Sequence, residues 1–362
     1  MKKIIVDIKG RPYPILVGRH LLDELGTWAA SFKIGTDAVV ITNRTVRRLY
    51  GAQVARAFAR KKISVRFIEI PDGEKSKSEK IAFELIQKIA AYDLRRRIFM
   101  VALGGGVIGD LAGFVAAIYK RGIPLVHVPT TFLAQIDSAI GGKTAIDLPA
   151  AKNLVGAFYQ PKLVVSDVAL LESLSPRQIR NGLAEAIKYG MIKDRRLLAL
   201  IDQNCKRLLA HDLKDLEQVV FACSRIKAKI VAEDERETLG LRTILNFGHT
   251  AGHAIEAASA YGVYQHGEAV ALGMRVAAAL SVKLGLCPAR DHKKLEALLT
   301  KAGLPQKIRK AKVSAILASM AHDKKNISSK NRFVLIRRIG CPRVVQGVPS
   351  DLIKKTLQEY SS

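Results

Sequence analysis

Apolar and polar positions in the first half of the chain follow two alternating patterns. Short runs rich in β-branched residues are separated by stretches in which apolar residues recur every three or four positions. The first pattern is typical of buried strands and the second of amphipathic helices. The predicted strands are residues 4–8, 38–41, 65–70, 99–103, 125–128 and 163–166, and two predicted helices are 45–59 and 78–91. This alternation predicts an α/β domain with a mostly parallel sheet.

The pattern changes after Pro176. Long helical stretches follow at residues 177–191, 213–231 and 269–284, with few strand signals before residues 332–339. A chain of 362 residues also exceeds the usual size of one hydrophobic core. We therefore expect two domains, residues 1–175 with the α/β sheet and residues 176–362, mainly helical.

Composition and the chain's start place this protein among folded cytoplasmic proteins. Hydrophobic residues make up 49% and charged residues 25%, which excludes a disordered chain. The longest apolar-looking stretch, residues 98–119, is broken by Gly104, Gly105, Gly106, Gly109 and Asp110, which excludes a membrane span. The N-terminus lacks the apolar core of a signal peptide. Four cysteines without C-x-x-C spacing indicate reduced, structural thiols.

The charge balance is strongly basic. Against 32 acidic residues stand 59 Lys and Arg, for a net charge of +27, which is enough to attract nucleic acid or an acidic surface nonspecifically. The basic residues are spread along the chain without interleaved aromatics. This distribution favours a solvated basic surface, with steering of an anionic substrate as a second possibility.

A glycine-rich turn follows the predicted strand at residues 99–103. Residues 104–110, Gly-Gly-Gly-Val-Ile-Gly-Asp, enter an apolar helix whose N-terminus could bind a phosphate through backbone amides. The turn lacks the Lys-Ser/Thr of a P-loop and departs from G-x-G-x-x-G, so a simple tight connection is an alternative. Two further turns, residues 71–77 and 129–131, also follow strands. Together they predict a dinucleotide site at one edge of the sheet.

Ligand-type residues are concentrated in the second half. His249 and His253 are four residues apart, hence on one face of a helix, and His266 follows. Glu185 lies in an apolar helical stretch, where an ionised carboxylate needs a strong partner. A carboxylate with imidazoles suits zinc or a similar divalent ion. Such histidine pairs are also common in cores, so both interpretations remain open at this point.

Several further motifs occur in a fixed order between Asp72 and about Gly340. They are residues 119–122 (Tyr-Lys-Arg-Gly), 135–138 (Gln-Ile-Asp-Ser), 141–147 (Gly-Gly-Lys-Thr-Ala-Ile-Asp), 152–158 (Lys-Asn-Leu-Val-Gly-Ala-Phe) and 323–326 (Asp-Lys-Lys-Asn). With the turns and histidines above, they resemble the dehydroquinate synthase family of sugar-phosphate cyclases.

The resemblance implies an N-terminal Rossmann-like, NAD-binding α/β domain and a C-terminal all-helical metal-binding domain. The implied activity is that of a carbon–oxygen lyase, which converts 3-deoxy-D-arabino-heptulosonate 7-phosphate to 3-dehydroquinate and phosphate in the shikimate pathway. The steps are transient oxidation by NAD, phosphate elimination, reduction, ring opening and intramolecular aldol closure. The implied cofactors are NAD and one divalent metal, Zn or alternatively Co. The protein is expected to be a cytoplasmic homodimer that binds no specific nucleic acid and no membrane.

The resemblance also implies the site residues. The metal ligands are Glu185, His249 and His266, with His253 beside them. The cofactor-binding residues are Asp72, Gly73, Glu74, Lys75, Ser76, Lys77, Gly105, Gly106, Val107, Ile108, Gly109, Asp110, Thr130, Thr131, Asp137, Lys143, Lys152, Leu170, Leu171, Glu172 and Ser173. The catalytic and substrate-binding residues are Lys143, Asn153, Lys188, Lys227, Glu237, Arg242, Asn246, His253, Lys324, Lys325 and Arg121, the last donated across a dimer interface.

Two positions depart from the family pattern. Asn43 stands where the family usually has an Asp that holds the adenosine ribose, and the segment from Glu237 to Arg242 is one residue longer than the common form. The alternatives are another sugar-phosphate cyclase, an iron-type polyol dehydrogenase, and a nucleic-acid-binding protein that has lost catalysis. Dehydrogenases of that type usually begin their metal set with Asp, so Glu185 argues against them.

Overall fold

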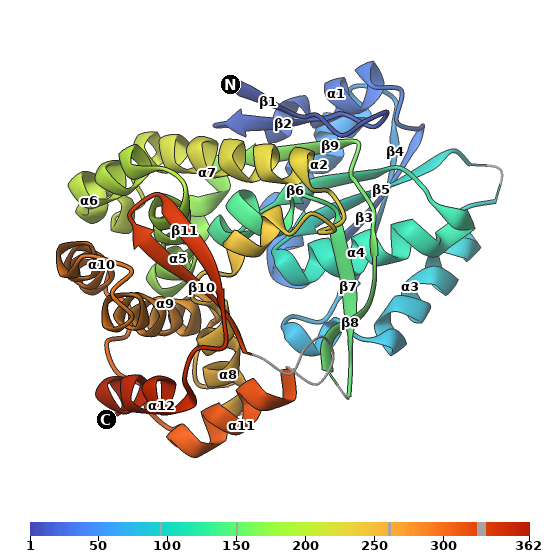
Figure 1. The fold of residues 1–362 in the computed structure, drawn as a ribbon. Coiled ribbons are helices and arrows are strands. Elements are labelled where there is room, and N and C mark those ends of the chain that lie inside the picture. Colours follow the sequence, from blue (N-terminus) through green and yellow to red (C-terminus); the bar gives the residue numbers. More distant parts are fainter. Residues whose placement is uncertain (95, 150, 260–261, 324–330) are drawn as a thin grey trace. The chain divides into compact units, whose positions relative to one another are not determined.

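The computed structural model describes residues 1–94, 96–149, 151–259, 262–323 and 331–362, which form two compact units (Figure 1). The first unit comprises Met1–Leu174 with Leu216–Arg236, and the second comprises Ser175–Asp215 with Glu237–Ser362. The sequence places residues 216–236 in the C-terminal domain, whereas the structure groups them with the N-terminal part. The contacts of this segment with the first unit include a hydrogen bond from Ser224 Oγ to the Gln135 carbonyl oxygen at 3.3 Å.

The first unit contains a seven-stranded sheet and a small hairpin. Its strands are β1 Lys2–Val6, β2 Tyr13–Gly18, β3 Asp37–Asn43, β4 Ser64–Ile70, β5 Ile98–Gly104, β6 Leu125–Pro129, β7 Lys143–Leu148, β8 Ala151–Phe158 and β9 Leu163–Asp167. Its α-helices are α1 Leu25–Ser31, α2 Arg44–Ala59, α3 Glu79–Tyr92 and α4 Gly106–Ile118. Helix α7, Leu213–Glu233, begins in the second unit and belongs to the first from Leu216 onward.

The strand order of the sheet creates a topological switch point. The order is β1-β2-β9-β6-β5-β3-β4, and every pair is parallel except β1 with β2. From β3 the chain moves outward to β4, then returns to β5 on the other side of β3. The carboxyl ends of β3 and β5 therefore flank the position where open α/β sheets bind nucleotides.

Each face of the sheet is covered by its own helices. Successive side chains of a strand point to opposite faces, so Val40 and Val101 pack against α1 and α2, whereas Val39 and Met100 pack against α3 and α4. Two apolar cores thus enclose the central strands, which explains their nearly continuous apolar runs. The result confirms the predicted α/β class with a mostly parallel sheet.

The second unit is mainly helical. Its α-helices are α5 Pro176–Ile192, α6 Arg195–Leu209, α8 His249–Ala258, α9 His266–Lys283, α10 Ala289–Lys301, α11 Val313–Asp323 and α12 Ser350–Tyr360. The C-terminal domain is helical as predicted, but it is not all-helical, because β10 Arg332–Arg338 and β11 Cys341–Gln346 form an antiparallel hairpin that packs on α9. Residues 332–339 do carry a strand signal in the sequence, and its partner strand lacks one.

Two further elements escaped prediction for identifiable reasons. Strand β2 contains Pro14, which usually argues against a strand. Its pairing with β9 begins only at Ile15, so the missing N–H of Pro14 costs no hydrogen bond on that side. Strand β8 is exposed along most of its length, so it is not one of the buried strands that the pattern of apolar residues identifies.

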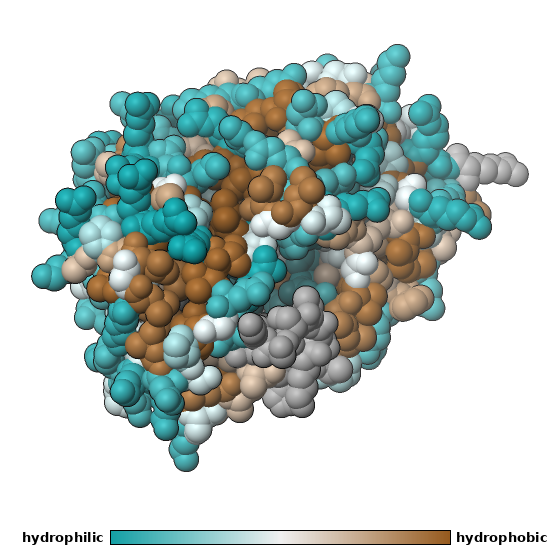
Figure 2. Space-filling view, in the orientation of Figure 1, coloured by the Kyte–Doolittle hydropathy of each residue, from teal (hydrophilic) through white to brown (hydrophobic). Residues whose placement is uncertain are grey.

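The described helices do not meet the requirements of a membrane span, and the visible face of the surface is not an even polar coat. None of the helices in the described ranges combines the length and the apolar composition that crossing a bilayer requires. On the face in Figure 2, hydrophilic residues are widely spread and apolar areas interrupt them. This face of the molecule therefore carries both polar and apolar areas.

Candidate functional site

Four ligand-type side chains gather in the second unit, where the first turns of α8 and α9 lie beside α5. Glu185, in the middle of α5, has an exposed fraction of 0%. His249 and His266 are the first residues of α8 and α9. Glu185 Oε1 lies 3.5 Å from Nε2 of each of these histidines. One fully buried carboxylate oxygen therefore faces two imidazoles.

The backbone before α8 fixes the place of His249. Gly248 has φ 82°, a left-handed conformation that glycine adopts without steric cost. A Cβ there would also lie 2.6 Å from Met274 Cγ and 2.8 Å from the Val270 carbonyl oxygen of α9. The glycine thus lets α8 begin in close contact with α9, which brings its first residue next to the first turn of that helix.

Both imidazole rings are oriented through their second nitrogen. His249 Nδ1 lies 3.3 Å from the Phe247 carbonyl oxygen, and His266 Nδ1 lies 3.4 Å from Glu256 Oε2. A carbonyl and a carboxylate accept hydrogen bonds, so each Nδ1 carries the proton that it donates. Each Nε2 is then the nitrogen that faces Glu185, as in metal-binding histidines held by an outer acceptor.

The charges around Glu185 are tightly coupled. Lys188, 1% exposed, places its ammonium against Glu185 Oε2. Burial opposes a charge on His266, but the carboxylates of Glu185 and Glu256 raise its pKa to about 10. Burial and the nearby Lys188 ammonium lower the pKa of His249 well below its usual range. The two histidines therefore lie in opposite electrostatic surroundings, because the carboxylates favour a positive charge on His266 whereas burial and Lys188 oppose one on His249.

The donor set fits a divalent metal ion. The nearest ring nitrogens of His249, His253 and His266 lie within 4.8 Å of one another. Together with Glu185, this arrangement offers imidazole nitrogens and a carboxylate oxygen, which zinc and similar ions prefer. His253 is the exposed member of the group. Geometry alone leaves open whether it binds the ion or lies beside it.

The other predicted residues of the second unit lie on the segment that leads to α8. Arg242 is buried, and its Nε lies 3.3 Å from Glu237 Oε1. Asn246 ends the short helix Leu241–Asn246 and is exposed, three residues before His249. Lys324 and Lys325 fall outside the described residues.

The predicted dinucleotide residues of the first unit lie at the carboxyl ends of the strands. Gly105 is the N-cap of α4 directly after β5, and Thr130 and Thr131 follow β6. The Thr131 methyl carbon would be 3.1 Å from a Cβ at position 105, so glycine keeps this approach open. Backbone amides at the start of α4 therefore remain accessible to a phosphate at the switch point.

Lys77 connects three predicted segments of this edge. It follows the turn after β4, and its side chain is nearly buried. Its ammonium lies 2.6 Å from Asp110 Oδ2 in α4 and also contacts Asn153 Oδ1 in β8. Burial raises the pKa of Asp110, and the Lys77 charge opposes that shift. The turn of residues 72–77 is thus tied to the helix that carries the glycines.

The lysines of the β7–β8 hairpin lie at its surface. Lys143, the first residue of β7, is exposed. Lys152 lies near the turn after β4, with Nζ 3.7 Å from Glu74 Oε1. Asn153 adopts φ 55°, and its N–H donates to Asp147 Oδ1 at 2.8 Å. The hairpin thus brings predicted cofactor and substrate residues beside the turn of residues 72–77.

Asp137 and Lys227 form a close pair within the first unit. Lys227 of α7 donates to Asp137 Oδ1 at 2.6 Å and to the Asp137 carbonyl at 2.7 Å. Asp137 lies in the π-helical turn Ala134–Ser138. The sequence assigned Lys227 to the helical domain, whereas its contacts place it beside the predicted cofactor residue.

The remaining predicted cofactor residues lie in the short helix Val168–Ser173 after β9. Tyr50 OH donates to Ser173 Oγ at 2.7 Å, which fixes this helix against α2. Leu170 and Leu171 are buried in the core, so their side chains are not available to a ligand. Asn43 ends β3, and its Oδ1 accepts the Val46 N–H at 2.8 Å as the N-cap of α2.

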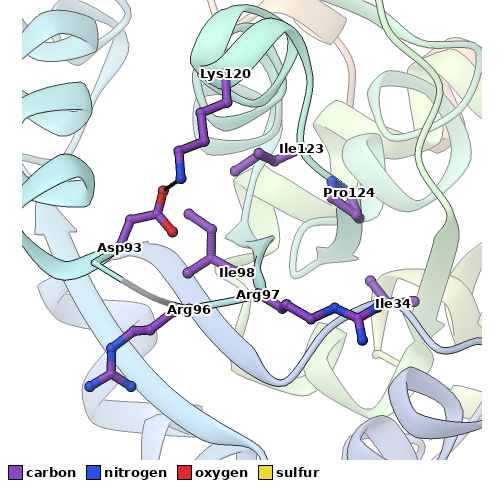
Figure 3. Close-up of a pocket in the computed structure, with 8 residues that line it drawn as sticks. All are labelled: Ile34, Asp93, Arg96, Arg97, Ile98, Lys120, Ile123 and Pro124. Atoms are coloured by element: carbon purple, nitrogen blue, oxygen red, sulfur yellow. Dashed lines mark ion pairs between the residues drawn. The ribbon is translucent and has the colours of Figure 1, made fainter.

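One pocket lies away from all of these groups. Its volume is about 270 Å³, and Figure 3 shows it beside Ile98 and Pro124, at the amino ends of β5 and β6. Its acid, Asp93, contacts the Lys120 ammonium, as the figure also shows. Arg121 follows Lys120 in a left-handed turn but does not line the pocket. The pocket lies at the sheet edge opposite the switch point and holds none of the predicted site residues.

Sequence reasoning missed two residues that support the histidine cluster. Asn181 lies one helical turn before Glu185, and its Oδ1 accepts the N–H of Gly267, next to His266. Glu256 follows His253 by three residues and contacts His266. Helical spacing could have placed Asn181 on the face of Glu185, but nothing in the sequence pairs Glu256 with a histidine ten residues away.

Comparison with known proteins extends over both units. Models of the 3-dehydroquinate synthase N-terminal and C-terminal domains match residues 67–181 and 182–326. The 3-dehydroquinate synthase of Desulforamulus reducens is 44% identical over 341 residues, which cover 94% of this chain and 95% of the relative.

Two solved structures have the same fold. A 2-deoxy-scyllo-inosose synthase complexed with carbaglucose-6-phosphate, NAD+ and Co2+ superposes with a TM-score of 0.90 at 30% identity, covering 99% of this chain and 100% of that one. The 2-epi-5-epi-valiolone synthase of Streptomyces hygroscopicus, with NAD+ and Zn2+ bound, gives a TM-score of 0.88 at 26% identity and covers 96% of each chain. The matched domains and the near full-length relative show that the chain belongs to the 3-dehydroquinate synthase family.

Proposed function

We propose that the chain converts 3-deoxy-D-arabino-heptulosonate 7-phosphate into 3-dehydroquinate and phosphate. The observation that carries this proposal is the cluster of Glu185, His249 and His266, in a chain 44% identical to a 3-dehydroquinate synthase over nearly its full length. The enzyme is then a phosphate-eliminating cyclase, a carbon–oxygen lyase of the shikimate pathway that leads to chorismate and the aromatic amino acids.

The proposed cofactors are NAD and one divalent ion, zinc or cobalt. Two structures of the same fold were solved with NAD+ and with Co2+ or Zn2+. When bound, NAD supplies reversible hydride transfer, and the ion polarises the substrate hydroxyl that is oxidised. In the second unit, Glu185, His249 and His266 would hold the ion, and the acceptors on both Nδ1 atoms keep the Nε2 atoms turned inward.

The first unit contributes the dinucleotide residues in this proposal. The backbone amides after Gly105 would hold the pyrophosphate at the start of α4, where the helix dipole favours a negative charge. Lys77, in the turn after β4, forms a hydrogen bond with Asp110 of that helix and so holds the turn and the helix together. The substrate-binding residues implied by the resemblance, in both units, stay predictions.

The alternatives are less well supported. The matched sugar-phosphate cyclases with other products are 30% and 26% identical to the chain, against 44% for a 3-dehydroquinate synthase. An iron-type polyol dehydrogenase would release NADH with each turnover, whereas the proposed reaction returns the hydride to the substrate. Net NADH production therefore separates the two classes of enzyme.

We also infer a homodimer in the cytoplasm. Apolar side chains on β8 and at the end of α4 are exposed, with Phe158 at 38%, Ile118 at 42% and Leu154 at 58%. A second copy of the chain would cover such residues and place Arg121 at the interface. Cys205 and Cys287 are buried free thiols, which suits a reducing compartment.

The direct test is phosphate release from 3-deoxy-D-arabino-heptulosonate 7-phosphate by the purified chain with NAD. We expect one phosphate per 3-dehydroquinate detected by mass spectrometry, no net NADH, loss of turnover with a chelator and recovery when Zn2+ or Co2+ is added. Absence of phosphate release with metal and NAD present would contradict the proposal, and turnover of another polyol phosphate would then identify a different cyclase.

Asn43 offers a second test, directed at the cofactor. Asn43→Asp should keep the N-cap, because Asp and Asn cap helices equally well. Its second oxygen adds an acceptor for a ribose hydroxyl, and one hydrogen bond of about 0.5–1.5 kcal/mol should tighten NAD binding roughly two- to tenfold. Isothermal titration measures the affinity. Asn43→Ser, which keeps a capping oxygen without the second acceptor, should show no gain; equal affinities of the Asp and Ser variants would contradict the ribose contact.

A further inference from the structure

Glu256 is the residue that orients the His266 imidazole. Its Oε2 lies 3.4 Å from His266 Nδ1, and its side chain is only 12% exposed. Glu256 is on α8, whereas His266 begins α9, so the contact joins the two helices that carry the histidines. A carboxylate in this place requires the Nδ1 proton and leaves Nε2 to face Glu185 at 3.5 Å.

We infer that Glu256 is a positioning residue for the metal site, which rests on the proposed role of His266 as a ligand. It selects the Nδ1–H tautomer of His266 and fixes the rotation of the ring. The negative charge of Glu256 also makes the imidazole a stronger electron donor through its Nδ1–H. His249 obtains its orientation differently, from the neutral Phe247 carbonyl. The two imidazoles are therefore held by acceptors of different charge.

The backbone at His266 is fixed independently of Glu256. Asn181 Oδ1 accepts the N–H of Gly267, and Arg177 of α5 forms two hydrogen bonds with Glu268, at 2.7 and 2.6 Å. Arg177, Asn181 and Glu185 follow each other at four-residue intervals along one face of α5. Since Arg177 and Asn181 of α5 hold the start of α9, loss of Glu256 should free the His266 ring to rotate without displacing α9.

The test compares zinc affinity in three substitutions. Outer carboxylates of metal-binding histidines typically contribute about 10–100-fold in affinity, so Glu256→Ala should weaken zinc binding by roughly that factor. Glu256→Gln keeps an oxygen acceptor but removes the negative charge, so zinc affinity should fall by a smaller factor than in Glu256→Ala. Glu359→Gln is the matched control, since that exposed carboxylate pairs with Lys283 on the surface and should leave the affinity unchanged.

A spectroscopic measurement separates positioning from general destabilisation. In the cobalt-substituted protein, Glu256→Gln and Glu256→Ala should change the visible absorption of the ion, while circular dichroism shows an unchanged fold. Wild-type zinc affinity and an unchanged cobalt spectrum in Glu256→Ala would overturn the inference. If the alanine variant does not fold, the same two measurements on Glu256→Gln decide.

One more variant distinguishes failure of this inference from failure of the proposed metal site. His266→Ala should lose zinc more completely than either Glu256 variant. If His266→Ala loses zinc while Glu256→Ala binds it normally, only the positioning role is wrong. If His266→Ala itself binds zinc as the wild type does, the proposed ligand set is wrong.

Discussion

His249→Ala is expected to abolish turnover and to remove the metal ion while the fold persists. Its Nε2 lies 3.5 Å from Oε1 of the fully buried Glu185, so its loss removes one of the two imidazoles that face this carboxylate. Loss of an outer acceptor alone costs about 10–100-fold in metal affinity, so loss of the ligand itself should cost at least the upper end of that range. Metal content after dialysis and phosphate release measure the two effects.

His292→Ala is the matched control. This histidine also lies in the second unit, on α10, where its Nε2 is 3.1 Å from Tyr360 OH. Its loss should lower stability slightly and leave metal content and turnover unchanged. Circular dichroism should be the same for both variants. A His249→Ala protein that retains stoichiometric zinc would contradict the assignment of His249 as a ligand.

The sequence predicts the sheet edge well because its signals are local. A strand followed by glycines and a helix fixes the position of Gly105 at a strand end, and strand order then puts this turn at the switch point. The hydrophobic period likewise predicts a helix at residues 177–191, which contains Glu185. Both of its ends lie within one residue of the observed ends of α5. Such features depend on backbone geometry and hydrophobic period, which neighbouring residues encode.

The support of the metal cluster depends on contacts between distant segments, and these lie beyond local patterns. Glu256 has the character of an ordinary solvent-facing residue of an amphipathic helix, and only the packing of α8 on α9 brings it to His266. Similarly, α7 is a helix by its sequence, but periodicity cannot tell that Lys227 pairs with Asp137 of the first unit. The unit that a helix joins depends on contacts with residues far along the chain, which the sequence of the helix alone does not show.

Gly267→Ala is expected to damage the metal site and the fold of the second unit together. A Cβ at position 267 would overlap the backbone carbonyl of Asn181. That carbonyl belongs to α5 and cannot move unless α5 itself shifts. Such overpacking typically costs about 1–3 kcal/mol, and here it also pushes His266 away from Glu185. Zinc affinity should therefore fall by more than the loss of stability explains.

Gly285→Ala is the control, because φ 69° strains its backbone but no atom lies within 4 Å of the new Cβ. That variant should lose stability and keep its zinc affinity, and equal zinc affinities in the two variants would show that the close approach of α5 and α9 does not position the ligand.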